Sequence, residues 1–413
     1  MTVDLLTLLG PVSLEEFFNR YWESRPLVLQ LDRAALCQSL LQVPDVEFLT
    51  ASLGSLDAKW IRLVNNRPGG PMREFQRPGQ GVSMDRILDA YREGTTVVLN
   101  DLQRRWPPIR DLASRLWHDF NDAAELPLRA VGVNAYLSPP NAEGLAAHFD
   151  SHCVFILQIS GRKTWTLYDE REELPSPDGL DPSASRATRA DAPGTRVHEV
   201  TLASGDFVYI PRGLVHKAQT ADSHSLHLAV GLYPCTWGEV LADAIRSVPA
   251  CRRSLPRGSL SGTHLSPETQ RAFASVMQSV VDRTSAATAI GLARTEIERL
   301  RERLQSRGFE RCHAVEAIDR HTRVVRRGDV RLSLTRQGEK VVMEIGSGNS
   351  FQAPAAAEPA LRYIIENRSF TLSFMPGMLS EGSKRVLVKR LLKEGVLELA
   401  PTEETCQTVA RTM

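Results

Sequence analysis

The pattern His148-Phe149-Asp150 has the residue types of a metal site, and a third candidate ligand, His216, follows 66 residues after Asp150 in the run IPRGLVHKAQT. Two histidines and one carboxylate hold non-haem Fe(II) on one face and leave the other face open for oxygen chemistry. His148 and Asp150 are two residues apart, so on a β-strand their side chains would point to the same side. The β-branched and aromatic run Phe207–Ile210 favours a second strand that would bring His216 alongside. These three residues are the predicted iron ligands.

An isolated H-x-D pair is weak support by itself, because such pairs more often form surface salt bridges or capped turns. Its surroundings strengthen the metal interpretation. Residues 153–159, the pair Ser160-Gly161 and residues 162–168 predict a strand, a tight turn and a second strand in a hairpin. Lys163 lies in this apolar β-segment and requires an anionic partner, since burying an unpaired ammonium is costly. A dicarboxylate bound beside the iron would supply that anion.

Four segments of the chain resemble the JmjC-type cupin oxygenases, most closely the ribosomal oxygenases. They are Asn134-Ala135-Tyr136, HFDSHCVFILQISGRKTW, IPRGLVHKAQT and HSLHLAVGLY. The similarity extends to residues 21–28 and, more loosely, to the C-terminal third. The resemblance implies an Fe(II)- and 2-oxoglutarate-dependent enzyme that uses O2 to hydroxylate side chains of ribosomal proteins.

The resemblance also implies a role for each matching residue. The positions that match the iron ligands of the family are His148, Asp150 and His216. Lys163 matches the basic residue that pairs with the distal carboxylate of 2-oxoglutarate, and Asn134 and Tyr136 match positions that line the cosubstrate pocket. This chain departs from the pattern at Gly231, where some relatives carry a serine. A hydroxyl partner for the cosubstrate would then be missing or replaced.

Other residues near the motif have simpler interpretations. His224 and His227 are three residues apart, so on a strand they face opposite sides and cannot both serve the metal. We interpret them as strand packing or as groups behind the ligands. His152 would be a spare ligand, but an open facial triad has no need of one. Trp165 is interpreted as a core residue.

The composition is that of an ordinary soluble globular protein, with 42% hydrophobic and 24% charged residues. The net charge of +1 gives no general attraction to nucleic acid or membrane. No apolar run approaches the roughly 20 residues that span a bilayer, and the N-terminus lacks the basic region of a signal peptide. The six cysteines contain no C-x-x-C and are interpreted as reduced thiols. We expect a cytoplasmic protein.

The predicted fold class is α+β, with a double-stranded β-helix (jelly-roll) core of the cupin/JmjC type. Short β-runs separated by Gly, Pro and Asp turns dominate from about residue 128 to 233. We expect a catalytic domain over residues 1–236, including its N-terminal helices and strands, a helical segment over 237–311 and a winged-helix-like domain over 312–413. Residues 169–196 form a loop without apolar periodicity, either a surface insertion or a lid over the substrate.

Apolar stripes in the helical segment 237–311 lack an evident partner, and related oxygenases dimerise at this place. We therefore expect a homodimer, with packing within the chain as the alternative. A basic helix is predicted over residues 384–393. A charge run on a helix is more often its solvated face, so nucleic-acid binding is not expected.

The preferred function is hydroxylation of a side chain in a protein or peptide, such as an arginine or histidine of a ribosomal protein. Three alternatives stay open: hydroxylation of a ribosomally made peptide natural product, demethylation of N-methyl-lysine, and a cupin scaffold without catalysis. Demethylation would need an aromatic cage, which the 6% aromatic content does not favour. Intact ligands and Lys163 argue against a vestigial site.

Overall fold

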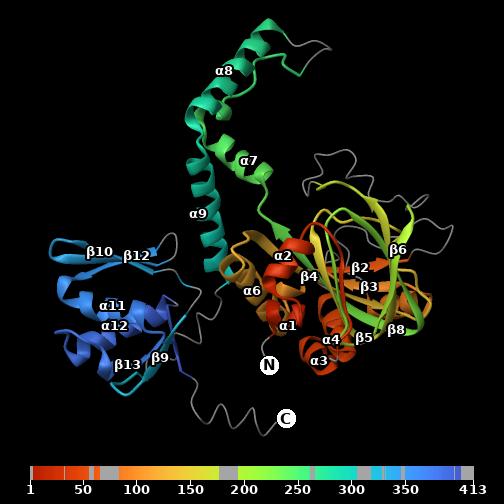
Figure 1. The fold of residues 1–413 in the computed structure, drawn as a ribbon, viewed down its shortest axis with the longest axis horizontal. Helices are drawn as coiled ribbons and strands as arrows, with labels where there is room; N and C mark the ends of the chain where they lie inside the picture. The colour runs from red at the N-terminus through yellow and green to blue at the C-terminus, as the bar shows by residue number, and fades with distance from the viewer. Residues whose placement is uncertain are drawn as a thin grey trace. The chain divides into compact units, whose positions relative to one another are not determined.

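The chain forms two compact units, residues 1–235 and 236–413. The computed structural model (Figure 1) describes residues 3–31, 33–54, 60–65, 83–175, 194–260, 266–304, 318–327, 330, 332–345, 349–394 and 396–400. Most of the predicted loop 169–196 lies outside these residues. None of the described helices is long and apolar enough to cross a membrane.

The first unit combines helices with an antiparallel sheet. Its helices are α1 Leu5–Leu9, α2 Leu14–Arg20, α3 Ala34–Leu40, α4 Val43–Gly54, α5 Met84–Arg92 and α6 Pro107–His118. Its strands are β1 Leu27–Leu29, β2 Ile61–Val64, β3 Thr96–Leu99, β4 Leu128–Ser138, β5 Cys153–Arg171, β6 Arg196–Leu202, β7 Phe207–Ile210 and β8 Leu214–Pro234. Two short helical turns flank α6: η2 Leu102–Arg104 follows β3, and η3 Asp119–Ala123 precedes β4.

The sheet order among the described strands is β1-β7-β5-β8-β4-β3-β2, and β6 also pairs with β5. Two long strands organise it, because β5 and β8 pair antiparallel over nearly their whole length. The first half of β5 also pairs with β7, and its second half pairs with β6. Strands that change partners in this way bend from one side of a core to the other, as in a double-stranded β-helix. Figure 1 shows these yellow and green strands curving around the unit.

The predicted hairpin at Ser160-Gly161 is wrong. β5 continues through these residues, and the pairing with β8 is merely shifted on either side of Gly161. Gly161 has φ +67°, and a Cβ there would lie 1.8 Å from the carbonyl oxygen of His224. A bulge with a left-handed glycine produces the same local sequence signal as a turn, but it only bends the strand.

The N-terminal segment packs on the outer strands of this sheet. Ser13 caps α2 and accepts a hydrogen bond from the backbone N–H of Glu16. β1 pairs with β7, which places Leu27 opposite Tyr209. The ring of Phe17 lies edge-on to that of Tyr209, with 5.0 Å between centroids. Aromatic packing therefore fixes the N-terminal helix to the strand that leads toward His216.

The second unit begins with helices, as expected, namely α7 Trp237–Ser247, α8 Pro267–Arg283 and α9 Ala286–Leu304. α7 begins with a complete capping box formed by Thr236 and Glu239. Helices α7 and α9 contact each other. A short 3-10 turn, Pro249–Arg252, follows α7.

The remaining elements surround a core of their own. They are β9 Arg323–Arg326, β10 Leu332–Gln337, β11 Lys340–Ile345, β12 Asn349–Pro354, α11 Glu358–Glu366, β13 Ser369–Thr371, α12 Glu381–Lys393 and β14 Leu397–Leu399, with short turns at Ala355–Ala357 and Leu372–Phe374. The described strands form two three-stranded sheets, β10-β11-β12 and β13-β9-β14. The basic helix of residues 384–393 is α12, whose apolar face is buried in this core.

Candidate metal centre and its pocket

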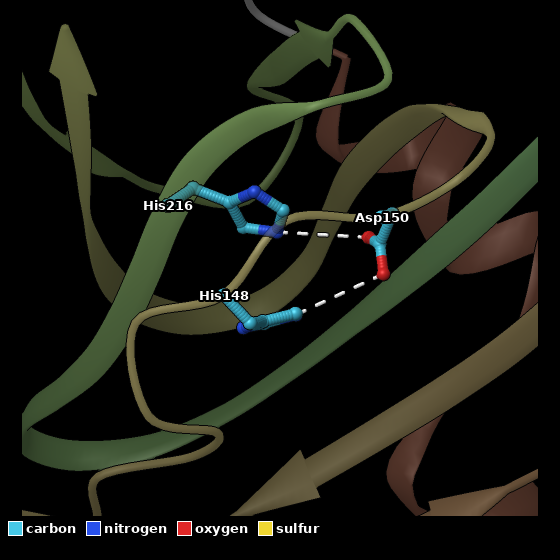
Figure 2. Close-up of side chains that lie close together, drawn as sticks. All are labelled: His148, Asp150 and His216. Atoms are coloured by element: carbon cyan, nitrogen blue, oxygen red, sulfur yellow. Dashed lines mark ion pairs between the residues drawn. The ribbon is translucent and has the colours of Figure 1, made fainter. Parts of the chain in front are cut away.

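The three predicted metal ligands lie together in the first unit (Figure 2). Their ligand atoms all fall within 4.8 Å of one another. The Nε2 atom of His148 is 3.9 Å from Oδ1 of Asp150, and Nε2 of His216 is 3.7 Å from Oδ2 of the same carboxylate. Asp150 thus faces both imidazoles, with space between the three side chains that a metal ion fits.

The backbone around these residues differs from the prediction in two ways. His148 and Asp150 are not on a named strand, since His148 forms only an isolated antiparallel bridge with His216. His216 belongs to β8 rather than to β7, which pairs with β5 instead. The bridge is nevertheless well made, with N···O distances of 3.0 and 2.8 Å. One extended residue pair is enough to bring the two histidines side by side.

Hydrogen bonds fix the orientation of both imidazoles. Nδ1 of His148 lies 2.8 Å from the carbonyl oxygen of Ala146, and Nδ1 of His216 lies 2.9 Å from that of Leu214. A carbonyl oxygen only accepts, so each Nδ1 carries the proton and each Nε2 presents its lone pair. Metal-bound histidines in proteins are held in this way, with the second nitrogen donating to a carbonyl or carboxylate.

The electrostatics favour a cation at the same place. Burial, followed by the nearby His148, lowers the pKa of His216 to about 4, so the imidazole is neutral and free to ligate. Burial alone would raise the pKa of Asp150, but the surrounding histidines His148, His152 and His216, together with Arg62, outweigh it and leave the pKa below its usual value. One ionised carboxylate and two neutral imidazoles are a donor set that fits Fe(II).

A cavity of about 500 Å³ opens beside these residues. It is lined by all six residues singled out from the sequence, His148, Asp150, His216, Lys163, Asn134 and Tyr136. Asn134 accepts a hydrogen bond from the backbone N–H of Asp101 (3.0 Å). Tyr136 lies parallel to the His227 ring, with centroids 4.8 Å apart. The size and mixed lining of the cavity suit a small polar ligand.

Lys163 is the most deeply buried charge in the pocket, with 2% of its surface exposed. Its Nζ donates a 2.9 Å hydrogen bond to Oγ of Ser138, which also bonds to Oγ1 of Thr96. No carboxylate among the described residues forms an ion pair with it. Burial therefore lowers the pKa of Lys163 to about 7. An anion entering the pocket would remove this penalty, which agrees with the partner predicted for Lys163 from the sequence.

The departure at Gly231 has a steric explanation. A Cβ at this position would lie 2.7 Å from the His152 ring, which stacks on Tyr233 with 4.5 Å between centroids. A serine there would require His152 to move. The His152 ring thus occupies the space that a serine side chain at position 231 would need. The hydroxyl next to Lys163 comes instead from Ser138 on β4.

Arg62 and His227 are pocket residues whose place the sequence did not predict. Arg62 on β2 lines the pocket and is hydrogen-bonded to Tyr136. It is a charge within an apolar β-segment, the same signal that identified Lys163. His227, interpreted as packing or as a group behind the ligands, also lines the cavity, and burial followed by Lys163 holds its pKa well below the usual value. Trp165 belongs to the core, as predicted, yet it also reaches the pocket.

Comparison with known proteins agrees with this geometry. The JmjC domain family matches residues 112–240. Ribosomal oxygenase 2 from Rattus norvegicus is 29% identical over 292 residues, which are 67% of this chain and 59% of the rat protein. The bifunctional lysine-specific demethylase and histidyl-hydroxylase NO66 from Drosophila grimshawi is 30% identical over 61% of this chain and 35% of its own length. The chain thus spans less than two thirds of these relatives.

A solved structure has the same fold along nearly the whole chain. It is YcfD, a ribosomal oxygenase from Escherichia coli, in complex with cobalt and 2-oxoglutarate. The TM-score is 0.51 at 17% identity, and the match covers 95% of this chain and 99% of YcfD. The cupin fold expected from the sequence is therefore confirmed. The JmjC domain match and the curated relatives confirm the resemblance to JmjC-type ribosomal oxygenases.

Proposed function

We propose that this chain, which carries a JmjC domain at residues 112–240 and resembles ribosomal oxygenases, is an Fe(II)- and 2-oxoglutarate-dependent oxygenase that hydroxylates a protein side chain. The observation that carries the proposal is the joint placement of the triad and Lys163 in one cavity of about 500 Å³. A structural metal site would need neither the cavity nor a buried ammonium.

In this proposal His148, Asp150 and His216 hold the iron, and Lys163 binds the distal carboxylate of 2-oxoglutarate. With dioxygen, the bound iron and 2-oxoglutarate supply the oxidising power, so that one oxygen atom enters the substrate and the other enters succinate as carbon dioxide leaves. Asn134, with Tyr136 beside it, forms a polar wall of the cosubstrate pocket. The residues of the chain act by positioning, because no protein group has to donate or remove a proton.

The proposed substrate is a ribosomal protein, with an arginine or histidine as the modified residue. This rests on the names of the relatives, which include ribosomal oxygenases and a histidyl-hydroxylase. The test is incubation with Fe(II), 2-oxoglutarate and peptides from ribosomal proteins, followed by mass spectrometry. We expect a peptide that gains the mass of one oxygen atom, with an equal amount of succinate. Loss of a methyl group from methyl-lysine peptides alone would indicate a demethylase instead, and no turnover with any peptide would contradict the proposal.

The depressed pKa of Lys163 gives a pH prediction for cosubstrate binding. In the free protein this pKa is about 7, and a bound carboxylate would raise it. Above about pH 7, binding of 2-oxoglutarate must therefore take up a proton, and its affinity must fall as the pH rises. Calorimetric titration of the Co(II)-loaded protein in two buffers of different ionisation enthalpy measures this uptake. The variant Lys163→Met should bind weakly and without proton uptake; proton uptake that persists in the variant would assign it to another group.

We also propose that the chain is a homodimer through residues 237–311. Rows of apolar side chains at helical spacing are exposed on α7 and α8, namely Trp237, Leu241 and Ile245, and Phe273, Met277 and Val281. A second copy of the same surface would cover them. Light scattering at micromolar concentration should give twice the chain mass of 45.9 kDa. A mass of 45.9 kDa with full activity would leave these helices without a role in assembly.

For the C-terminal elements we keep the proposal of a winged-helix-like domain that does not bind nucleic acid.

A further inference from the structure

The segment of residues 21–28 resembles known oxygenases in sequence but contributes no residue to the pocket lining. Its Glu23 nevertheless forms a short ion pair with Arg212, with 2.7 Å between Oε1 and Nη2. Only 9% of the Arg212 side chain and 27% of the Glu23 side chain are exposed. A largely buried ion pair of this kind holds its two segments together, because separating them would leave a buried charge without a partner of opposite charge.

Arg212 lies in the turn that joins β7 to β8, and this turn touches two of the three proposed ligands. The next residue, Gly213, donates its backbone N–H to the carbonyl oxygen of Asp150 at 2.8 Å. The residue after that, Leu214, supplies the carbonyl that orients the imidazole of His216 at 2.9 Å. Movement of this turn would therefore shift the main chain of Asp150 and rotate His216.

The turn itself has little freedom. Gly213 has φ +84°, and a Cβ there would lie 1.9 Å from the carbonyl oxygen of Glu172. Its own carbonyl accepts from the N–H of Glu172 at 2.9 Å. Arg212 is the residue of this turn that carries a charge, and its guanidinium faces Glu23.

Glu23 is fixed at a second point as well. Its backbone has φ +50°, a left-handed conformation that is costly for a residue with a side chain. Its N–H donates to the hydroxyl of Tyr209 at 2.8 Å, and that hydroxyl donates to Sγ of Cys153 at 3.3 Å. The main chain of Glu23 is thus tied to β7 and β5, while its side chain is tied to the turn after β7.

We infer that Glu23 and Arg212 are positioning residues for the metal centre, through which the N-terminal segment holds Asp150 and His216 in ligating geometry. Neither side chain lines the pocket, so neither is expected to touch metal, cosubstrate or substrate. The inference rests on the proposed metal site. Outer groups that orient metal ligands typically contribute 10–100-fold to metal affinity.

The test is a Co(II) titration, followed by the visible absorption of the bound ion, of the full chain and of the variants Glu23→Gln and Arg212→Lys. We expect Co(II) affinity to fall by about tenfold or more in both. The matched control is Asp206→Asn. Asp206 is also buried, and its carboxylate accepts from the N–H groups of Leu31 at 3.2 Å and Ala203 at 2.8 Å. It therefore also ties the chain near the N-terminus to the sheet, but its side-chain hydrogen bonds go to residues outside the 211–213 turn. Urea unfolding of each variant reports stability separately.

The control variant should lose stability while keeping the Co(II) affinity of the unchanged protein. The inference is overturned if Glu23→Gln and Arg212→Lys bind Co(II) as tightly as the unchanged protein, or if Asp206→Asn weakens binding equally. If Glu23→Gln does not fold, Arg212→Lys decides alone, because it retains the positive charge and loses only the planar contact. Failure of the unchanged protein to bind Co(II) would instead refute the metal site itself.

Discussion

Replacing His148 or Asp150 by alanine should abolish Fe(II)-dependent succinate formation, while the protein should stay folded. Each residue supplies one of three proposed ligands, and two ligands do not hold Fe(II) in an open facial site. The fold should survive, because the side chain of Asp150 is 32% exposed and that of His148 is 17% exposed, so truncation leaves no large buried void. Succinate release and circular dichroism measure the two effects.

The matched control is His224→Ala on the same strand as His216. His224 is exposed and contacts only the hydroxyl of Ser160 among the described partners, at 3.4 Å. This variant should keep full turnover. Undiminished turnover in the double variant of His148 and Asp150 would refute their assignment as metal ligands.

Replacing Lys163 by alanine should raise the 2-oxoglutarate requirement several hundredfold and leave the Fe(II) requirement nearly unchanged. Removing one partner of a buried charge pair costs ~3–5 kcal/mol, and each ~1.4 kcal/mol is a factor of ten in affinity. The side chain is almost wholly buried and bonds to Ser138, so Lys163→Met should be measured beside it to separate lost charge from lost packing. Succinate formation at graded 2-oxoglutarate concentrations gives the apparent KM.

The neighbouring Arg162 provides the control for this prediction. It is exposed, whereas Lys163 is buried, because adjacent residues of β5 face opposite sides. Arg162→Ala should leave the cosubstrate KM unchanged. An unchanged KM in Lys163→Ala, together with a raised one in Arg162→Ala, would transfer the role to Arg162.

The candidate site could be predicted from the sequence because its chemistry depends on residue types that are costly elsewhere. A buried lysine in an apolar strand requires an anion, and two histidines beside a carboxylate favour a metal. Lys163 and the pair His148 and Asp150 are local signals, whereas His216 lies 66 residues after Asp150 and was added because a strand precedes it. The structure places these residues in one pocket, although the strands that carry them differ from those predicted.

The errors concern strand continuity, which local sequence does not determine. The pair Ser160-Gly161 predicts a turn, but in the structure it is a bulge in β5, because β8 continues alongside on both sides of it. His148 was expected on a strand and forms only one bridge. In both cases the outcome depends on a partner more than 50 residues away in the sequence, which periodicity does not reveal.

Arg62 and the Glu23–Arg212 pair were missed for a related reason. Arg62 reaches the pocket from β2 at the sheet edge, and it comes near Tyr136 on β4 because Val98 of the intervening strand β3 pairs with both residues. Glu23 and Arg212 are separated in sequence by most of the first unit. The apolar segment around Arg62 marks it as a charge in a strand. Its partner, like the Glu23–Arg212 ion pair, follows from the topology of the sheet.

The most direct test of the metal and cosubstrate assignment is an anaerobic titration of the protein with Fe(II) and 2-oxoglutarate, followed by visible absorption. Chelation of iron by a 2-oxo acid produces a charge-transfer band that neither component gives alone. We predict this band in the unchanged protein, its absence in Asp150→Ala, and its appearance only at much higher 2-oxoglutarate concentration in Lys163→Ala. No band in the unchanged protein, or an equal band in Asp150→Ala, would contradict the assignment of the metal ligands and of the cosubstrate pocket.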